Sequence, residues 1–298
     1  MKKLTLKTKQ SIAGWLFVTP WLIGLLVFFI QPVSNFLIWS FFKYQNVVGG
    51  GYELQSLDHP FQNYINAWRD DVDYPPRFTG AFEHFLYAVP IIVVFSLFCA
   101  ILLNQNFKGR AFMRAVFFLP VITTSGVFGL ITTRGMSLAQ VEAATTTDSA
   151  MFDVSLLTEF LIESGIPAKL VESLSGAVSN VASLIWNSGV QILIFLIGLL
   201  AIPESYYEAA KVEGATGWET FWKITFPVVS PFILANTIYT FITECMSTSN
   251  GVITYVSELS GNFHYSEASA MMWMYFMAML VIVAAIFGIG SKLMVSSR

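Results

Sequence analysis

The sequence has few charged residues and long stretches with none. Only 12% of its 298 residues are charged, against about 25% in a typical soluble domain, while 55% are hydrophobic. A soluble fold of this length could not bury so much apolar surface. A soluble globular protein is therefore excluded, and we expect the lipid bilayer to be the solvent of this chain.

Residues typical of catalytic and metal sites are also scarce. The chain has three histidines and two cysteines, and none of these residues has the spacing of a metal site. A nucleophile elbow and a phosphate-binding loop are absent, and the sequence contains no Gly-Lys dipeptide. An ATPase within this chain is excluded, and an enzyme lacks support. We expect no metal or cofactor in the chain, no nucleic-acid partner, and apolar packing roles for Cys99 and Cys245.

Six apolar stretches are long enough to cross a bilayer. A hydrocarbon core of about 30 Å needs about 20 helical residues, and continuous rather than alternating apolar runs favour helices over a barrel. The fold class that we predict is an all-α integral membrane protein with six transmembrane helices. The first stretch is expected to be a retained span, because its apolar core is too long for a signal peptide. The expected spans are residues 12–32, 85–105, 115–133, 178–202, 226–246 and 268–290.

The basic residues predict the orientation of these spans. With the N-terminus inside, eleven of the sixteen Lys and Arg residues lie in the inner segments 1–11, 104–114, 204–223 and 292–298. The positive-inside rule therefore places both termini in the cytoplasm.

Two outer loops are long, at residues 43–84 and 134–172. The first is acidic and carries the Pro75-Pro76 pair, and its position suggests a docking site for an external protein. The second contains an amphipathic helix, which lies either against the outer membrane face or a partner, or simply packs within the loop.

The inner segment 204–227 interrupts the apolar pattern with four acids and two lysines. Good helix formers around Glu208 are followed by Gly214 and Gly217, which predicts two short helices joined by a glycine bend. The slim Ala209-Ala210 pair suits a helix that enters a groove of another protein, where Glu208 could pair with a basic residue. The alternative is a plain linker between two spans.

The spacing within this segment is specific. It contains Glu-Ala-Ala at 208–210, then three other residues and Gly214, then nine other residues and Ile224-Thr225-Phe226-Pro227. This resembles the EAA loop of permease subunits of binding-protein-dependent ABC importers, with Phe226 as the one departure, in place of Leu. The flanking residues are similar to the carbohydrate branch, which includes the maltose and glycerol-phosphate transporter permeases, and Glu213 stands where that branch has Asp.

The resemblance covers most of the chain except the outer loops, and it implies a type I ABC importer permease fold in one domain, residues 1–298. It implies a multi-pass protein of the bacterial inner or plasma membrane. The implied partners are a second homologous permease in a heterodimer, two cytoplasmic ATPase subunits that bind ATP and Mg, and an extracytoplasmic solute-binding protein. The implied solute is a carbohydrate such as an oligosaccharide; the alternative is phosphate, a polyamine or an amino acid. The implied coupling residues are Glu208, Ala209, Ala210, Glu213, Gly214, Ile224 and Pro227.

Polar side chains within two expected spans are candidates for the solute path. Residues at spacings of three and four in the fifth span predict one polar helical face, and polar groups within a span usually face a cavity or a partner helix. Glu244 has a second interpretation, because it lies near the outer interface, where a carboxylate costs little. The candidates are Asn187, Gln191, Asn236, Thr240, Thr243 and Glu244.

Overall fold

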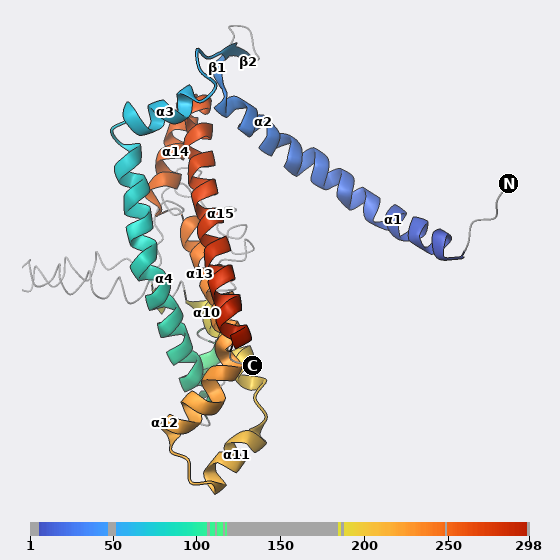
Figure 1. Cartoon of the computed structure of the whole chain (residues 1–298), viewed down its shortest axis with the longest axis vertical. Coiled ribbons are helices and arrows are strands. Elements are labelled where there is room, and N and C mark those ends of the chain that lie inside the picture. The colour runs from blue at the N-terminus through green and yellow to red at the C-terminus, as the bar shows by residue number, and fades with distance from the viewer. Residues whose placement is uncertain are drawn as a thin grey trace, which may run out of the picture. The chain divides into compact units, whose positions relative to one another are not determined.

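The computed structural model describes residues 6–46, 52–105, 108–110, 112–115, 117, 184–185, 188–247 and 249–296. These residues are helical except for one hairpin and short connections (Figure 1). The chain separates into two compact units, Met1–Phe78 with Thr254–Ala278, and Thr79–Ile253 with Met279–Arg298.

The first unit begins with a long helical segment. It consists of α1 (Leu6–Leu25), the π-helical turn η1 (Leu26–Ile30) and α2 (Gln31–Ser40). Pro32 has no N–H for the carbonyl four residues earlier, and the amide of Gln31 bonds back five residues to Leu26 instead. The helix therefore passes the expected end of the first span and continues to Ser40.

The expected outer loop 43–84 contains regular structure. Strands β1 (Phe42–Asn46) and β2 (Tyr52–Ser56) form an antiparallel hairpin, and α3 follows at Gln62–Arg69. The Tyr44 backbone N–H donates to Ser266 Oγ at 2.6 Å, and the Asn63 amide donates to the Ser40 carbonyl at 2.9 Å. The hairpin and α3 are thereby held to helical parts of the same unit.

The acidic segment of this loop starts the next helix, α4 (Tyr74–Asn104). Asp71 Oδ1 accepts from the amides of Asp73 and Tyr74 at 2.9 and 2.7 Å, which satisfies donors at the helix start. Asp71 Oδ2 accepts from the hydroxyl of Tyr255 at 2.7 Å, on α14 (Gly251–Gly261). Burial, and then this hydrogen bond, raise the pKa of the Tyr255 phenol above its ordinary value. Helix α4 thus begins at Tyr74 rather than near residue 85, because Asp71 caps it there.

The second unit contains the rest of α4, α10 (Gly189–Leu200), α11 (Glu204–Val212), α12 (Gly217–Thr220), η3 (Phe221–Thr225) and α13 (Phe226–Cys245). It also contains the C-terminal part of α15 (Tyr265–Ser296). Helices α10 and α13 approach closely at Gly198, where a Cβ would lie 2.8 Å from Cδ2 of Phe232. Phe85 of α4 packs against Phe241 of α13 with 5.2 Å between ring centroids.

Four helices are long and apolar enough to cross a membrane: Gly14–Ser40, Tyr74–Asn104, Gly217–Cys245 and Tyr265–Lys292. A fifth is counted if α10 and α11, which are bent by 63°, form one span. Three of the expected segments lie wholly or partly outside the described residues. These are nearly all of the third span, the outer loop 134–172 and the start of the fourth span. The structure therefore indicates a multi-pass membrane protein, and the number six remains a prediction.

Candidate functional site

After α10 the chain changes direction, and α11 is bent by 63° relative to α10. Pro203 is extended, with φ −61° and ψ 138°, and α11 begins at the next residue. Gly214 ends α11 with φ +75°, a conformation that only glycine adopts freely. The amide of Ala215 donates back to the Ala210 carbonyl at 2.9 Å, which satisfies a carbonyl of the last turn. The predicted pair of short helices with a glycine bend is confirmed.

The second short helix is capped by its own residues and continues into a span. The Glu219 amide donates to Thr216 Oγ1 at 3.3 Å, and the Thr216 amide donates to Glu219 Oε2 at 2.9 Å. This reciprocal capping box starts α12. At η3, Phe226 bonds back five residues to Phe221, just before Pro227. Residues Gly217–Cys245 thus form one continuous helical span.

The predicted coupling residues differ in exposure. Glu208, Ala209, Glu213, Gly214 and Pro227 are exposed, Ile224 is half-buried, and Ala210 is buried at 7% exposure. The two alanines therefore have different environments. Ala209 lies on the open face beside Glu208, whereas Ala210 packs against the protein itself. The coupling role of both alanines stays a prediction.

Three of the candidate path residues come together between α10 and α13. Gln191, Asn236 and Thr240 are all buried, and Asn236 Nδ2 donates to the Gln191 carbonyl at 2.9 Å. Gln191 Oε1, Asn236 Oδ1 and Thr240 Oγ1 have no hydrogen-bond partner among the described residues. We call these three residues the polar seam.

The remaining path candidates lie elsewhere. Thr243 is exposed, and its hydroxyl donates to the Tyr239 carbonyl of its own helix at 2.9 Å. The buried seam therefore does not extend to Thr243, and the place of Thr243 in a solute path stays a prediction. Asn187 lies outside the described residues.

Glu244 contacts His84, which in turn contacts Tyr87, and the sequence did not indicate either residue. His84 Nε2 of α4 lies 3.2 Å from Glu244 Oε2, and His84 Nδ1 lies 2.8 Å from the Tyr87 hydroxyl. The Glu244 side chain is only 10% exposed, whereas that of His84 is 45% exposed. The sequence contained one indication of this contact, because an acid at the end of an apolar span, such as Glu244, needs a partner. The sequence does not tell which histidine supplies it, since the two residues are 160 positions apart.

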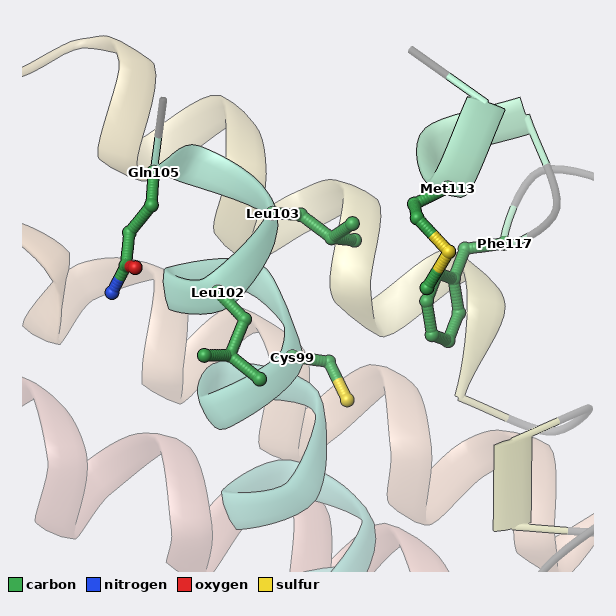
Figure 2. A pocket seen from close by; sticks show the side chains of 6 residues that line it. All are labelled: Cys99, Leu102, Leu103, Gln105, Met113 and Phe117. Atoms are coloured by element: carbon green, nitrogen blue, oxygen red, sulfur yellow. The ribbon is translucent and has the colours of Figure 1, made fainter. Parts of the chain in front are cut away.

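A cavity of about 350 Å³ lies at the C-terminal end of α4, near Cys99 and Leu103. In Figure 2, the side chains of these two residues point toward Met113 and Phe117. The lining of this cavity is almost entirely apolar, with the amide of Gln105 as the polar exception. A carbohydrate needs several polar partners for its hydroxyl groups, so this cavity does not have the lining of a carbohydrate site.

Comparisons with known proteins place the chain in a family. A probable ABC transporter permease protein of Bacillus subtilis (strain 168), YesP, is 31% identical over 306 residues, which cover 96% of this chain and 91% of that protein. The lactose transport system permease protein LacF of Rhizobium radiobacter is 25% identical, over 78% of this chain and 73% of that protein. No family model matches the sequence. The chain belongs to the ABC transporter permeases.

A solved structure shows the same fold. It is that of a bacterial alginate ABC transporter in complex with an alginate pentasaccharide-bound periplasmic protein. One of its chains matches this protein with a TM-score of 0.66 and 16% identity, over 96% of each chain. The chain therefore shares the fold of a chain of an ABC transporter.

Proposed function

We propose that this chain is the permease subunit of a bacterial ABC importer that moves a carbohydrate, in particular an oligosaccharide, across the cytoplasmic membrane. The relative LacF is named for lactose transport, and the structural neighbour belongs to an alginate transporter. Import of a non-sugar solute is the alternative, because the EAA spacing is shared by importers of several solutes. The six-span arrangement with both termini in the cytoplasm is part of this proposal.

One observation carries the coupling part of the proposal. The exposed carboxylate of Glu208 lies on α11, a short helix set at 63° to α10 and followed by the Gly214 bend. The chain then enters the span Gly217–Cys245 without a break in helical structure. A protein that binds α11 is thus connected to a membrane helix through a few residues.

The partners would act on this connection. Two separate ATPase subunits would bind ATP and Mg, and each would receive the α11 helix of one permease in a heterodimer. Their closure around ATP would bring the two α11 helices together and tip the permeases between inward- and outward-facing states. An external binding protein would deliver the solute, by analogy with the pentasaccharide-bound periplasmic protein that accompanies the alginate transporter. This chain would perform no covalent chemistry.

The solute route is proposed to pass near the His84–Glu244 pair and the polar seam. Carboxylate, imidazole and phenol groups suit the hydroxyls of a sugar, and His84 and Tyr87 are both accessible. The seam has three buried oxygen atoms without a partner among the described residues. Such atoms are costly in an apolar environment unless they are hydrogen-bonded, and the hydroxyls of a passing sugar would satisfy them.

The test is a charge reversal, Glu208→Lys, in the reconstituted complex. Loss of one partner of a buried charge pair costs about 2–5 kcal/mol, so ATPase binding and solute-stimulated hydrolysis should fall at least about tenfold. The measurements are ATPase co-purification and hydrolysis with and without the loaded binding protein. Glu258→Lys is the matched control, because it reverses an exposed charge on α14, outside residues 204–227, which we call the coupling segment. Unchanged hydrolysis in Glu208→Lys would exclude this residue as the coupling charge, and failure of wild type to bind any ATPase would overturn the proposed function.

A further inference from the structure

One hydrogen bond joins helix α11 to the N-terminal part of the following span, Gly217–Cys245. The hydroxyl of Tyr207 lies 3.1 Å from Oγ1 of Thr225, 18 residues later in the chain. Thr225 is buried, at 7% exposure, in the π-helical turn η3. We propose that Tyr207 and Thr225 are positioning residues, whose hydrogen bond passes the movement of α11 to the span. This inference rests on the proposed function, in which ATPase subunits move α11.

The rest of α11 makes little contact with the protein. Seven of its residues are exposed; Tyr207 is half-buried, and Ala210, one turn later on the same side, is buried. Among the described residues, Tyr207 is the one α11 residue whose side chain has a hydrogen bond. The helix therefore contacts the rest of the second unit only along a narrow line, through Tyr207 and Ala210, and its other face, with Glu208, is open to a partner.

The direct chain connection from α11 to the span contains one conformationally permissive residue. It runs through Gly214, whose positive φ reflects a bend without side-chain restraint. Part of a push on α11 would be absorbed there as a change of backbone angle. The hydrogen bond between Tyr207 and Thr225 bypasses this bend, because it joins α11 to a point beyond α12.

The point of attachment is a weak place in the span. At η3, the amide of Phe226 bonds to the Phe221 carbonyl, five residues earlier, because Pro227 has no N–H for the regular pattern. A helix changes direction more readily at such a turn than in regular α-helix. Displacement of Thr225 would consequently tilt α13 relative to α12, rather than move both as one rod.

Two variants remove one hydroxyl each and preserve side-chain shape: Tyr207→Phe and Thr225→Val. The number of solute molecules imported per ATP hydrolysed should fall about two- to tenfold, the range that corresponds to the loss of one hydrogen bond. ATPase co-purification should be retained, because Glu208 and the open face are unchanged. Thr225→Ser keeps the hydroxyl and should restore the wild-type ratio. Tyr239→Phe, a tyrosine of α13 outside the coupling segment, is the matched control and should have no effect.

The double variant Tyr207→Phe/Thr225→Val separates this role from a merely structural one. If the two hydroxyls act through one bond, the double variant is no worse than either single variant. Additive losses, or an unchanged transport ratio in Tyr207→Phe, would overturn the inference. Should Thr225→Val fail to insert, Tyr207→Phe and Thr225→Ser still decide the question.

The Glu208→Lys arm distinguishes the two proposals. If Glu208→Lys abolishes stimulated hydrolysis while Tyr207→Phe transports with the wild-type ratio, the proposed function stands and the positioning role is wrong. If wild type binds no ATPase, the proposed function and the positioning role are both overturned.

Discussion

The coupling segment, residues 204–227, and the polar seam of Gln191, Asn236 and Thr240 are both polar parts of an apolar chain, yet they differ in packing. In the coupling segment, Thr216 and Glu219 satisfy each other, and charged side chains such as Glu208 remain exposed. In the seam, the side chains are buried and one amide–carbonyl bond joins α10 to α13. The coupling segment thus leaves charged side chains accessible at its surface, while the seam joins two helices of this protein. The following substitutions test this difference, from the largest expected effect to the smallest.

The close approach of α10 and α13 should be the most sensitive feature. In Gly198→Val, the new side chain would collide with the Phe232 ring, where even a Cβ would lie 2.8 Å away. Overpacking of this kind costs about 1–3 kcal/mol, so we expect a lower unfolding temperature and less monodisperse protein after extraction. Gly288→Val is the matched control, because nothing lies within 4 Å of its Cβ position. Equal stability of the two variants would contradict the close packing at Gly198.

Asn236 should contribute less to stability than Gly198. In Asn236→Ala, the seam loses the hydrogen bond to the Gln191 carbonyl, and interhelical bonds in membranes contribute about 0.6–1.7 kcal/mol. Thermal unfolding in detergent should show the loss, while Thr243→Ala, at an exposed position on the same helix, should show little change. If stability stays constant and apparent solute affinity falls instead, the seam serves the solute rather than the packing, and the comparison must be revised.

The smallest effect is expected at the capping box of the coupling segment. Thr216→Ala removes the side-chain acceptor for the Glu219 amide, which typically costs about 1 kcal/mol of local helix stability. Because α12 is only four residues long, hydrogen exchange of the amides at 217–220 should accelerate while the global unfolding temperature stays nearly constant. Thr216→Ser retains the acceptor and should exchange at the wild-type rate. A large drop in global stability would show that the segment is part of the core, like the seam.

Several features were accessible from the sequence because they depend on local chemistry. Gly214 and Gly217 among helix formers predicted the bend between α11 and α12, which the structure confirms. Charge-free runs predicted the spans that the structure describes, although α4 begins earlier than expected. Its start depends on Asp71, whose capping role was hidden in an acidic stretch that suggested a docking loop instead.

Other features were not accessible because they join distant parts of the chain. Periodicity placed Asn236, Thr240, Thr243 and Glu244 on one helical face, but packing against α10 buries the first two and leaves Thr243 exposed. His84 meets Glu244 only when α4 lies beside α13. Likewise, Tyr207 gave no signal in the sequence, because its hydrogen-bond partner is a hydroxyl 18 residues away across the glycine bend.

The sequence by itself determined the membrane environment, the helical class and the polar segment between two spans, since composition and local spacing govern these properties. Membership in the permease family followed from the same spacing and agrees with the identity to YesP. The tertiary structure alone decided which polar groups are satisfied, exposed or buried, because those outcomes depend on which helices pack together. Gly198 beside Phe232, Asn236 beside Gln191 and Tyr207 beside Thr225 are contacts between elements, and a linear pattern of residues contains no information on their partners.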